Sequence, residues 1–305
     1  IGLGATVYDG TTWTTYDEAN SDLSDDHITS VAFDAGGRAW FGTRSGDVNV
    51  FDGATWTIHP DPTYNHNATY AVGVDHAGQI WFTSPYNYAP LLTYDGTYWQ
   101  HVTPEGGCDY WVRQGAFDGA GQLWLSTWAG LCHYDGATWT RYHTGNSQVL
   151  DDSTEAITAQ GQTVWLGYGD GSGVEPVTVS QFDGSTWHHL VKPDFLPRPF
   201  GQGIAVDREG RKWFGLAPKG VAMFDGDEWT LYDDTNSGLP DTCTVLIAVD
   251  LAGHLWFAGD QCAGGLVEYD GLSWTQHYAP SGGVPDTMVQ ALAVDQEDHL
   301  SLIHI

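Results

Sequence analysis

The chain has few basic residues: ten lysines and arginines stand against 39 aspartates and glutamates in 305 residues. The resulting net charge of −29 repels the phosphates of nucleic acids and the headgroups of anionic membranes. We therefore expect no nucleic-acid partner and no membrane contact by this chain. Many of the aspartates occupy repeated turn positions, so part of the acidity belongs to the architecture.

Helical periodicity and the common catalytic motifs are also missing. The 39 glycines and 13 prolines argue against long helices, and no run of residues is long and apolar enough to span a membrane. There is no kinase motif, no H-E-x-x-H, no C-x-x-C, no Gly-rich phosphate loop and no G-x-S-x-G, and the 13 histidines are dispersed. These absences favour a non-enzymatic role for this chain and identify no catalytic residue, no metal ligand and no cofactor.

The chain does contain a repeat. An aromatic-Asp-Gly-x-x-Trp phrase recurs seven times at intervals of 40–48 residues, with aspartates at Asp9, Asp52, Asp95, Asp135, Asp183, Asp225 and Asp270. A second phrase, V-A-x-D-x-x-G-x-x-W-F-G, alternates with it at residues 31–42, 72–83, 115–126, 204–215 and 247–258, with a degenerate copy at 157–167. A fixed period of this size is typical of one supersecondary unit repeated many times.

Each phrase predicts a tight β-hairpin, because Asp and Gly at the turn are flanked by β-forming residues. Two hairpins make four short strands, which we name A to D in chain order. Radially repeated units of four strands are the blades of a propeller. We therefore predict an all-β fold, a seven-bladed β-propeller of four-stranded antiparallel blades.

The two ends of the chain are predicted to share one blade. Six complete units are preceded by residues 1–16, with the end of a B strand followed by C and D, and are followed by an A strand near residues 289–295. The repeat breaks off after Leu300, where Ser301 stands at the position of an expected Trp. Residues 300–305 also resemble the translation of a sequencing-library adapter. We expect one propeller domain over residues 1–300, a fragment truncated at both ends, and a non-native tail at 301–305.

The repeat resembles the two-component regulator propeller family. The residues that carry the likeness are N-S-G-L-P-D at 236–241, I-A-V-D at 247–250 and W-F-G-T at 40–43. The resemblance covers nearly the whole chain and implies an extracytoplasmic sensor domain. The D-x-x-G-x-x-W-F phrase is more weakly similar to streptogramin lyase-like propellers, which implies a lyase or hydrolase as the alternative.

The four cysteines fall into two pairs with the same topology. Cys108 and Cys132 lie in one unit, and Cys243 and Cys262 in another. In each pair the first cysteine precedes strand A and the second is expected in the B–C loop of the same blade. We predict the disulfides Cys108–Cys132 and Cys243–Cys262, and hence a periplasmic or extracellular location. Four free or buried thiols are the alternative.

The repeat spacing separates a constant face from a variable face. The A–B and C–D turns keep their lengths, whereas the B–C loops vary and share the other face with the D–A connectors. Variable loops on a rigid scaffold are where binding usually resides, and the central channel of a propeller opens there too.

Subtracting the two phrases leaves Trp111 and Trp128 as off-template tryptophans. The candidate ligand-binding residues are Trp111, Trp128, Tyr110, Tyr86, Tyr88, Tyr64 and Arg113. Flat aromatic rings beside polar groups suit sugar rings, but they also suit a partner protein or simple filling between loops. Arg113 is one of five basic residues on variable-face segments, where a cation could bind a carboxylate or sulfate.

The sequence thus favours a sensing or recognition propeller of a two-component-type signalling protein. Its ligand would be a saccharide or another small molecule on the variable face. Its signalling partner would be a kinase domain or a partner protein outside this fragment. A secreted adhesive or interaction scaffold remains a further alternative beside the lyase.

Overall fold

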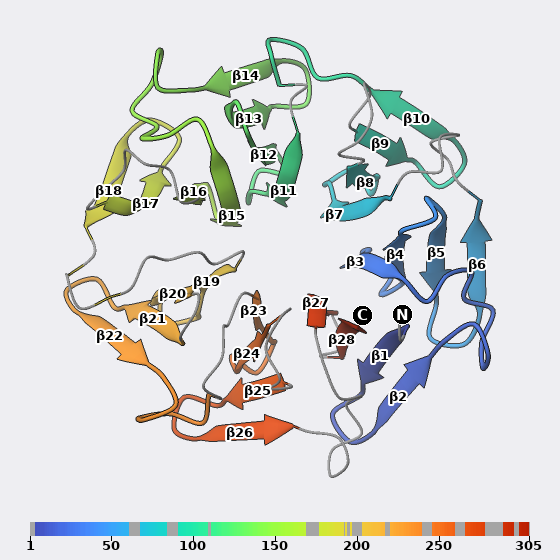
Figure 1. Cartoon of the computed structure of the whole chain (residues 1–305). Helices are drawn as coiled ribbons and strands as arrows, with labels where there is room; N and C mark the ends of the chain where they lie inside the picture. Colours follow the sequence, from blue (N-terminus) through green and yellow to red (C-terminus); the bar gives the residue numbers. More distant parts are fainter. Residues whose placement is uncertain are drawn as a thin grey trace.

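The protein is a seven-bladed β-propeller. In the computed structural model, 28 strands form seven four-stranded antiparallel sheets that stand around a central axis, and no helix occurs among the described residues (Figure 1). The predicted fold class is confirmed. The structure describes residues 4–60, 68–83, 91–108, 111–168, 177–191, 193, 196, 203–216, 220–239, 246–259, 266–277, 289–295 and 299–304.

Six blades are consecutive segments of the chain, each ordered A to D from the axis outward. Blade 1 contains β3 (Ile28–Phe33), β4 (Ala39–Thr43), β5 (Val48–Phe51) and β6 (Trp56–His59). Blade 2 contains β7 (Tyr70–Val74), β8 (Ile80–Thr83), β9 (Leu91–Tyr94) and β10 (Trp99–Val102). Blade 3 contains β11 (Val112–Phe117), β12 (Leu123–Thr127), β13 (Gly130–Tyr134) and β14 (Trp139–Tyr142).

The other three consecutive blades repeat this order. Blade 4 contains β15 (Thr154–Gln160), β16 (Thr163–Tyr168), β17 (Val177–Phe182) and β18 (Trp187–Val191). Blade 5 contains β19 (Ile204–Val206), β20 (Lys212–Gly215), β21 (Val221–Phe224) and β22 (Trp229–Tyr232). Blade 6 contains β23 (Leu246–Val249), β24 (Leu255–Ala258), β25 (Leu266–Tyr269) and β26 (Trp274–His277).

The closing blade joins the two ends of the chain, as predicted. Its strands are, from the axis outward, β27 (Val289–Val294), β28 (Leu300–His304), β1 (Ala5–Tyr8) and β2 (Trp13–Tyr16). The B strand of this blade was expected to end within residues 1–3, but β28 occupies that place and pairs with both β1 and β27. Two strands from each end therefore complete the ring and leave no open sheet edge between its first and last blades.

The aspartate of the second phrase holds both a turn and a tryptophan. In blade 1, Asp34 Oδ1 accepts hydrogen bonds from the backbone N–H groups of Gly36 and Arg38, at 2.9 and 3.0 Å. Its Oδ2 accepts one from the indole N–H of Trp40, at 2.9 Å. The same indole bond occurs in blades 2, 3, 5 and 6, from Trp81, Trp124, Trp213 and Trp256. Each strand-B tryptophan is thereby fixed in orientation within the core.

Aromatic rings fill the space between adjacent blades. Trp40 is 1% exposed, stacks on His59 of its own blade at 5.8 Å between ring centroids, and contacts Tyr94 of blade 2 at 5.6 Å. Similar contacts link Trp213 to Tyr269 and Trp256 to Tyr8 in other blade pairs. Most of the tryptophans thus belong to the scaffold, and the rigid ring that they form positions the loops at its ends.

Candidate functional site

A central cavity of about 630 Å³ lies on the propeller axis, and strand A of every blade contributes to its wall. Its volume falls within the range of small-molecule binding sites. The residues that line it are Thr29, Ser30, Val31, Tyr70, Thr83, Trp111, Val112, Arg113, Gln114, Gly115, Trp128, Glu155, Ile157, Thr158, Gly203, Ile204, Leu246, Ile247, Ala291 and Leu292.

The cavity belongs to the variable face. Most of its lining residues stand near the start of strand A, where the chain arrives from a D–A connector. Trp128 comes instead from the B–C turn of blade 3, between β12 and β13. Both kinds of segment meet at the variable face of the ring, so the structure places the cavity where loop spacing predicted a binding site.

Trp111 and Trp128 form a stacked pair at this cavity. Their ring centroids lie 5.2 Å apart and their planes are 11° from parallel. The two side chains are 49% and 52% exposed, whereas the tryptophans of strand B are buried. Half-exposed indoles at a cavity give a flat apolar surface that a ligand can cover.

The backbone of Trp111 adopts an unusual conformation. Its φ is +30°, and it is the one non-glycine residue with a positive φ in the described part of the chain. A bulky residue in this region costs on the order of 1–3 kcal/mol and persists only where the surrounding structure holds it. Such strain is found more often at binding sites than in plain scaffold.

Arg113 and Glu155 form an ion pair across two blades at the same cavity. The pair joins Nη1 of Arg113, on β11, to Oε2 of Glu155, on β15, and the side chains are 33% and 22% exposed. The guanidinium carbon of Arg113 also lies 5.1 Å from the ring centroid of Trp128. Arg113 therefore contacts both a carboxylate and an indole, an arrangement that fixes its planar group.

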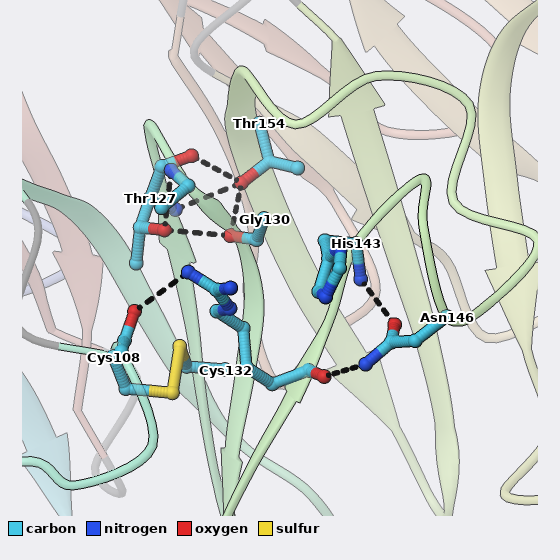
Figure 2. Close-up of a disulfide and its surroundings, with 10 residues drawn as sticks. Cys108, Thr127, Gly130, Cys132, His143, Asn146 and Thr154 are labelled. Carbon is cyan, nitrogen blue, oxygen red and sulfur yellow. Dashed lines mark hydrogen bonds between the residues drawn. A yellow bond between two sulfur atoms is a disulfide. The ribbon is translucent and has the colours of Figure 1, made fainter.

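A hydrogen-bonded turn positions Trp128. Figure 2 shows the bonds that Thr127 and Gly130, on either side of this turn, make with each other and with Thr154. The Thr127 hydroxyl donates to the carbonyl of Gly130 at 2.8 Å and accepts from the N–H of Ala129 at 3.0 Å. The hydroxyl of Thr154, in the neighbouring blade, accepts from the N–H of Thr127 at 2.8 Å and donates to its carbonyl at 2.9 Å. Thr127 and Thr154 are fully buried, and their bonds tie the turn that carries Trp128 to two blades.

Cys108 and Cys132 are joined by a disulfide with their Cα atoms 5.7 Å apart, and both are fully buried (Figure 2). Cys132 lies within β13, opposite Leu125 and Arg141, and not in the B–C loop as predicted. The loop of blade 3 is a tight turn at Trp128, so Cys132 already belongs to strand C. The bridge ties the connector that leads to Trp111 onto blade 3, and it excludes Cys132 as a nucleophile paired with His133.

Several predicted residues lie outside the described part of the structure. The ligand-binding candidates among them are Tyr64, Tyr86, Tyr88 and Tyr110. The cysteines among them are Cys243 and Cys262. The described candidates Trp111, Trp128 and Arg113 are brought together at one place, the cavity wall.

Sequence reasoning missed Glu155 and the polar residues Thr29, Thr83 and Gln114 of the cavity wall. A usable signal was present for most of the wall. The residues a few positions before the second-phrase aspartate line the channel in blade after blade, as Thr29 does ahead of Asp34. Glu155 is harder to find because its blade carries the degenerate copy of that phrase.

A buried Ser–His contact in blade 4 is structural. The Tyr168 hydroxyl donates to Ser180 Oγ at 2.7 Å, and His189 Nδ1 lies 2.8 Å from the same oxygen. Burial raises the pKa of Tyr168 to about 12 and lowers the pKa of His189. Ser180 is fully buried and cannot meet a ligand. Among the described residues, no group of three or more His, Cys, Asp or Glu side chains is placed to hold a metal ion.

Solved structures share this architecture. The extracellular domain of a protein described as a hybrid two-component system from B. thetaiotaomicron superposes with a TM-score of 0.74 at 19% identity, covering 96% of this chain and 41% of that one. Virginiamycin B lyase from Staphylococcus aureus gives a TM-score of 0.68 at 12% identity, covering 92% and 95%. YCF48 from Cyanidioschyzon merolae gives 0.65 at 12% identity, covering 91% and 95%.

These similarities establish the propeller fold. The chain spans about two fifths of the length of the two-component domains that it matches. No protein-family model and no curated protein matches the sequence. In the part of the chain that the structure describes, no helix combines the length and apolarity needed to cross a membrane.

Proposed function

We propose that this chain is an extracytoplasmic recognition propeller of a two-component-type sensor that binds a saccharide or similar small ligand in its central cavity. The observation that carries the proposal is the half-exposed Trp111–Trp128 stack on the cavity wall. The C–H face of a sugar ring packs on such a surface, while its hydroxyls take hydrogen bonds from neighbouring polar groups.

The two sides of the cavity differ in a way that fits this ligand class. Blades 1 to 4 supply the tryptophans together with hydroxyl, amide and charged groups, including Thr29, Tyr70 and Gln114. Blades 5 and 6 and the closing blade supply mainly aliphatic side chains, such as Ile204 and Leu292. A saccharide has both hydroxyl-rich edges and apolar faces, so both walls of the cavity can contact it.

The buried Cys108–Cys132 bridge supports the proposed periplasmic or extracellular location, because stable disulfides form in oxidising compartments. The similarity of the fold to extracellular domains of two-component systems supports the proposed sensor role. In a sensor, a bound ligand would change contacts with a kinase domain or partner protein. The lyase and scaffold alternatives have no observation in their favour beyond the shared fold.

Glycan-array binding, followed by calorimetry on the glycans that bind, tests this proposal. Trp111→Ala and Trp128→Ala should each weaken binding at least about tenfold, or about 1.4 kcal/mol, because each removes an aromatic contact. Tyr98→Ala is the matched control, since Tyr98 is 73% exposed in the C–D turn of blade 2, on the constant face. Circular dichroism and melting temperature check the fold. Binding that survives both tryptophan changes would rule out the site.

A further inference from the structure

The charges on the cavity wall are already paired. Among the described residues that line the cavity, only Arg113 and Glu155 carry a formal charge at neutral pH. They contact each other across β11 and β15, so the described wall has one cation and one anion side by side. The guanidinium of Arg113 also lies over Trp128, which forms half of the aromatic stack. The charged pair is therefore in direct contact with the aromatic stack that we propose as the ligand-binding surface.

A charged ligand would have to break this pair. A carboxylate or sulfate that approached Arg113 would compete with Glu155 for the guanidinium and would meet the Glu155 charge at close range. A cationic ligand that approached Glu155 would meet Arg113, which also occupies a cation–π position on Trp128. The two side chains are partly exposed, at 33% and 22%, and lie against the cavity wall, so water screens their contact less than it screens widely separated surface charges.

We infer that the cavity selects uncharged saccharides, and that Glu155 sets this selectivity by neutralising Arg113. The inference rests on the proposed function and narrows its ligand class. It differs from the expectation that Arg113 captures an acidic group on a glycan, and the experiment below decides between the two. An uncharged sugar can donate and accept hydrogen bonds at the edges of the pair without separating its two charges.

The net negative charge of the whole chain also disfavours the binding of anionic ligands. A net charge of −29 on 305 residues lowers the local concentration of acidic ligands at the surface. Salt screens this long-range effect over a Debye length of about 8 Å at physiological ionic strength. Rejection by the Arg113–Glu155 pair acts at contact distance, so it should persist when salt is added.

The test uses an array of oligosaccharides in matched sets, each with a neutral member, a uronic-acid member and an amino-sugar member. Wild-type protein should bind neutral members and bind their acidic counterparts at least about tenfold more weakly. Glu155→Gln should raise binding of the acidic members about tenfold, because Arg113 is then available to a carboxylate. The gain should remain at elevated salt, since it arises from a contact inside the cavity.

Glu228→Gln is the matched control, because it removes the same charge at an exposed position in the C–D turn of blade 5. It should leave the ranking of the glycans unchanged. Wild-type protein that prefers acidic members, or a Glu155→Gln protein with no gain for them, would overturn the charge selectivity while leaving glycan recognition in place. Folded proteins that bind no glycan at all would overturn the proposed function and this inference together. Melting temperatures establish that each variant is folded.

Discussion

The imidazole of His133 lies flat on the indole of Trp124, with ring centroids 4.0 Å apart and planes 17° from parallel. His133 Nε2 lies 2.9 Å from Oε1 of Gln122. Burial disfavours the charged imidazolium and lowers the pKa of His133, against weaker opposing effects of Asp118 and Asp135. Burial against the strand-B tryptophan of blade 3 thus favours the neutral form of this histidine.

Folding stability should fall as the solution becomes mildly acidic. The folded-state pKa of His133 is below its unfolded value of about 6.5, so the unfolded chain binds more protons near that pH. The contribution of His133 to the free energy of unfolding is then fully present above about pH 6.5 and decreases as the pH falls below that value. Burial also lowers the pKa values of His59 and His189, which add to the same trend. Urea denaturation from pH 7.5 to 5.5 should show a steadily decreasing midpoint.

His133→Gln should make this pH dependence shallower, because it removes one titrating group. His101→Gln is the control, since His101 is exposed on the outer strand β10. It should leave the slope as in the wild type. A His133→Gln protein that loses stability with pH as steeply as the wild type would show that His133 does not contribute.

Removing the second-phrase aspartate should be costly. Asp118 is 6% exposed, accepts the indole N–H of Trp124 at 2.9 Å and accepts two backbone N–H groups of its turn. Asp118→Ala leaves these donors without their acceptor, so we expect a loss of about 2–3 kcal/mol in the free energy of unfolding. Urea denaturation measures it.

Asp135→Ala is the matched control for Asp118→Ala. Asp135 also accepts two backbone N–H groups, in the C–D turn of the same blade, but these groups are exposed to water. Water can replace a lost acceptor there, so the change should cost less. Equal losses in the two variants would show that the buried indole bond adds no stability.

The fold could be predicted because most blades repeat the same turn chemistry, with blade 4 as the exception. Asp34 and its equivalents hold both a turn and a tryptophan through residues of one short phrase. That phrase can be recognised in the amino-acid sequence alone. The prediction that the closing B strand comes from the N-terminus was wrong, because Ser301 replaces the tryptophan that marks this strand elsewhere. Backbone pairing does not require that marker, and β28 forms beside β1 regardless.

The site was only partly predictable. Trp111 and Trp128 stood out because they remained after the repeat was subtracted. Glu155 did not, because its role arises from a contact between blades that exists only once the ring is closed. The position of Cys132 was misjudged because distance along the chain from Trp124 does not reveal how short the B–C turn is.

The Cys108–Cys132 disulfide should resist reduction in the folded protein. Both sulfur-bearing residues are fully buried, so a thiol reductant has no access until the blade opens. Alkylation and mass spectrometry after dithiothreitol treatment should find these thiols labelled only in denaturant. The double variant Cys108→Ala/Cys132→Ala should lose about 3 kcal/mol of stability, as expected for a loop of this length.

The second predicted bridge, Cys243–Cys262, is tested by counting thiols in denaturant without reductant. No free thiol supports both bridges. Two free thiols that map to Cys243 and Cys262 would remove the second bridge alone. Four free thiols would contradict both.

Adding even a methyl group at Gly130, beside the B–C turn of blade 3, should destabilise the fold. Gly130 has a φ of +120°, and a Cβ added there would lie 2.2 Å from the carbonyl oxygen of Tyr142. Gly136, in the C–D turn of the same blade, has a φ of +95° with no atom within 4 Å of an added Cβ. Gly136→Ala should therefore cost about 1 kcal/mol from backbone strain alone.

Gly130→Ala should cost about 3 kcal/mol, because β13 must also move away from β14. This movement would shift the turn that carries Trp128, since the Gly130 carbonyl accepts the Thr127 hydroxyl bond. We expect glycan binding to weaken in Gly130→Ala and to remain at the wild-type level in Gly136→Ala, measured by calorimetry below both melting temperatures. Binding that falls equally in both variants would indicate that general destabilisation, and not the position of Trp128, controls the site.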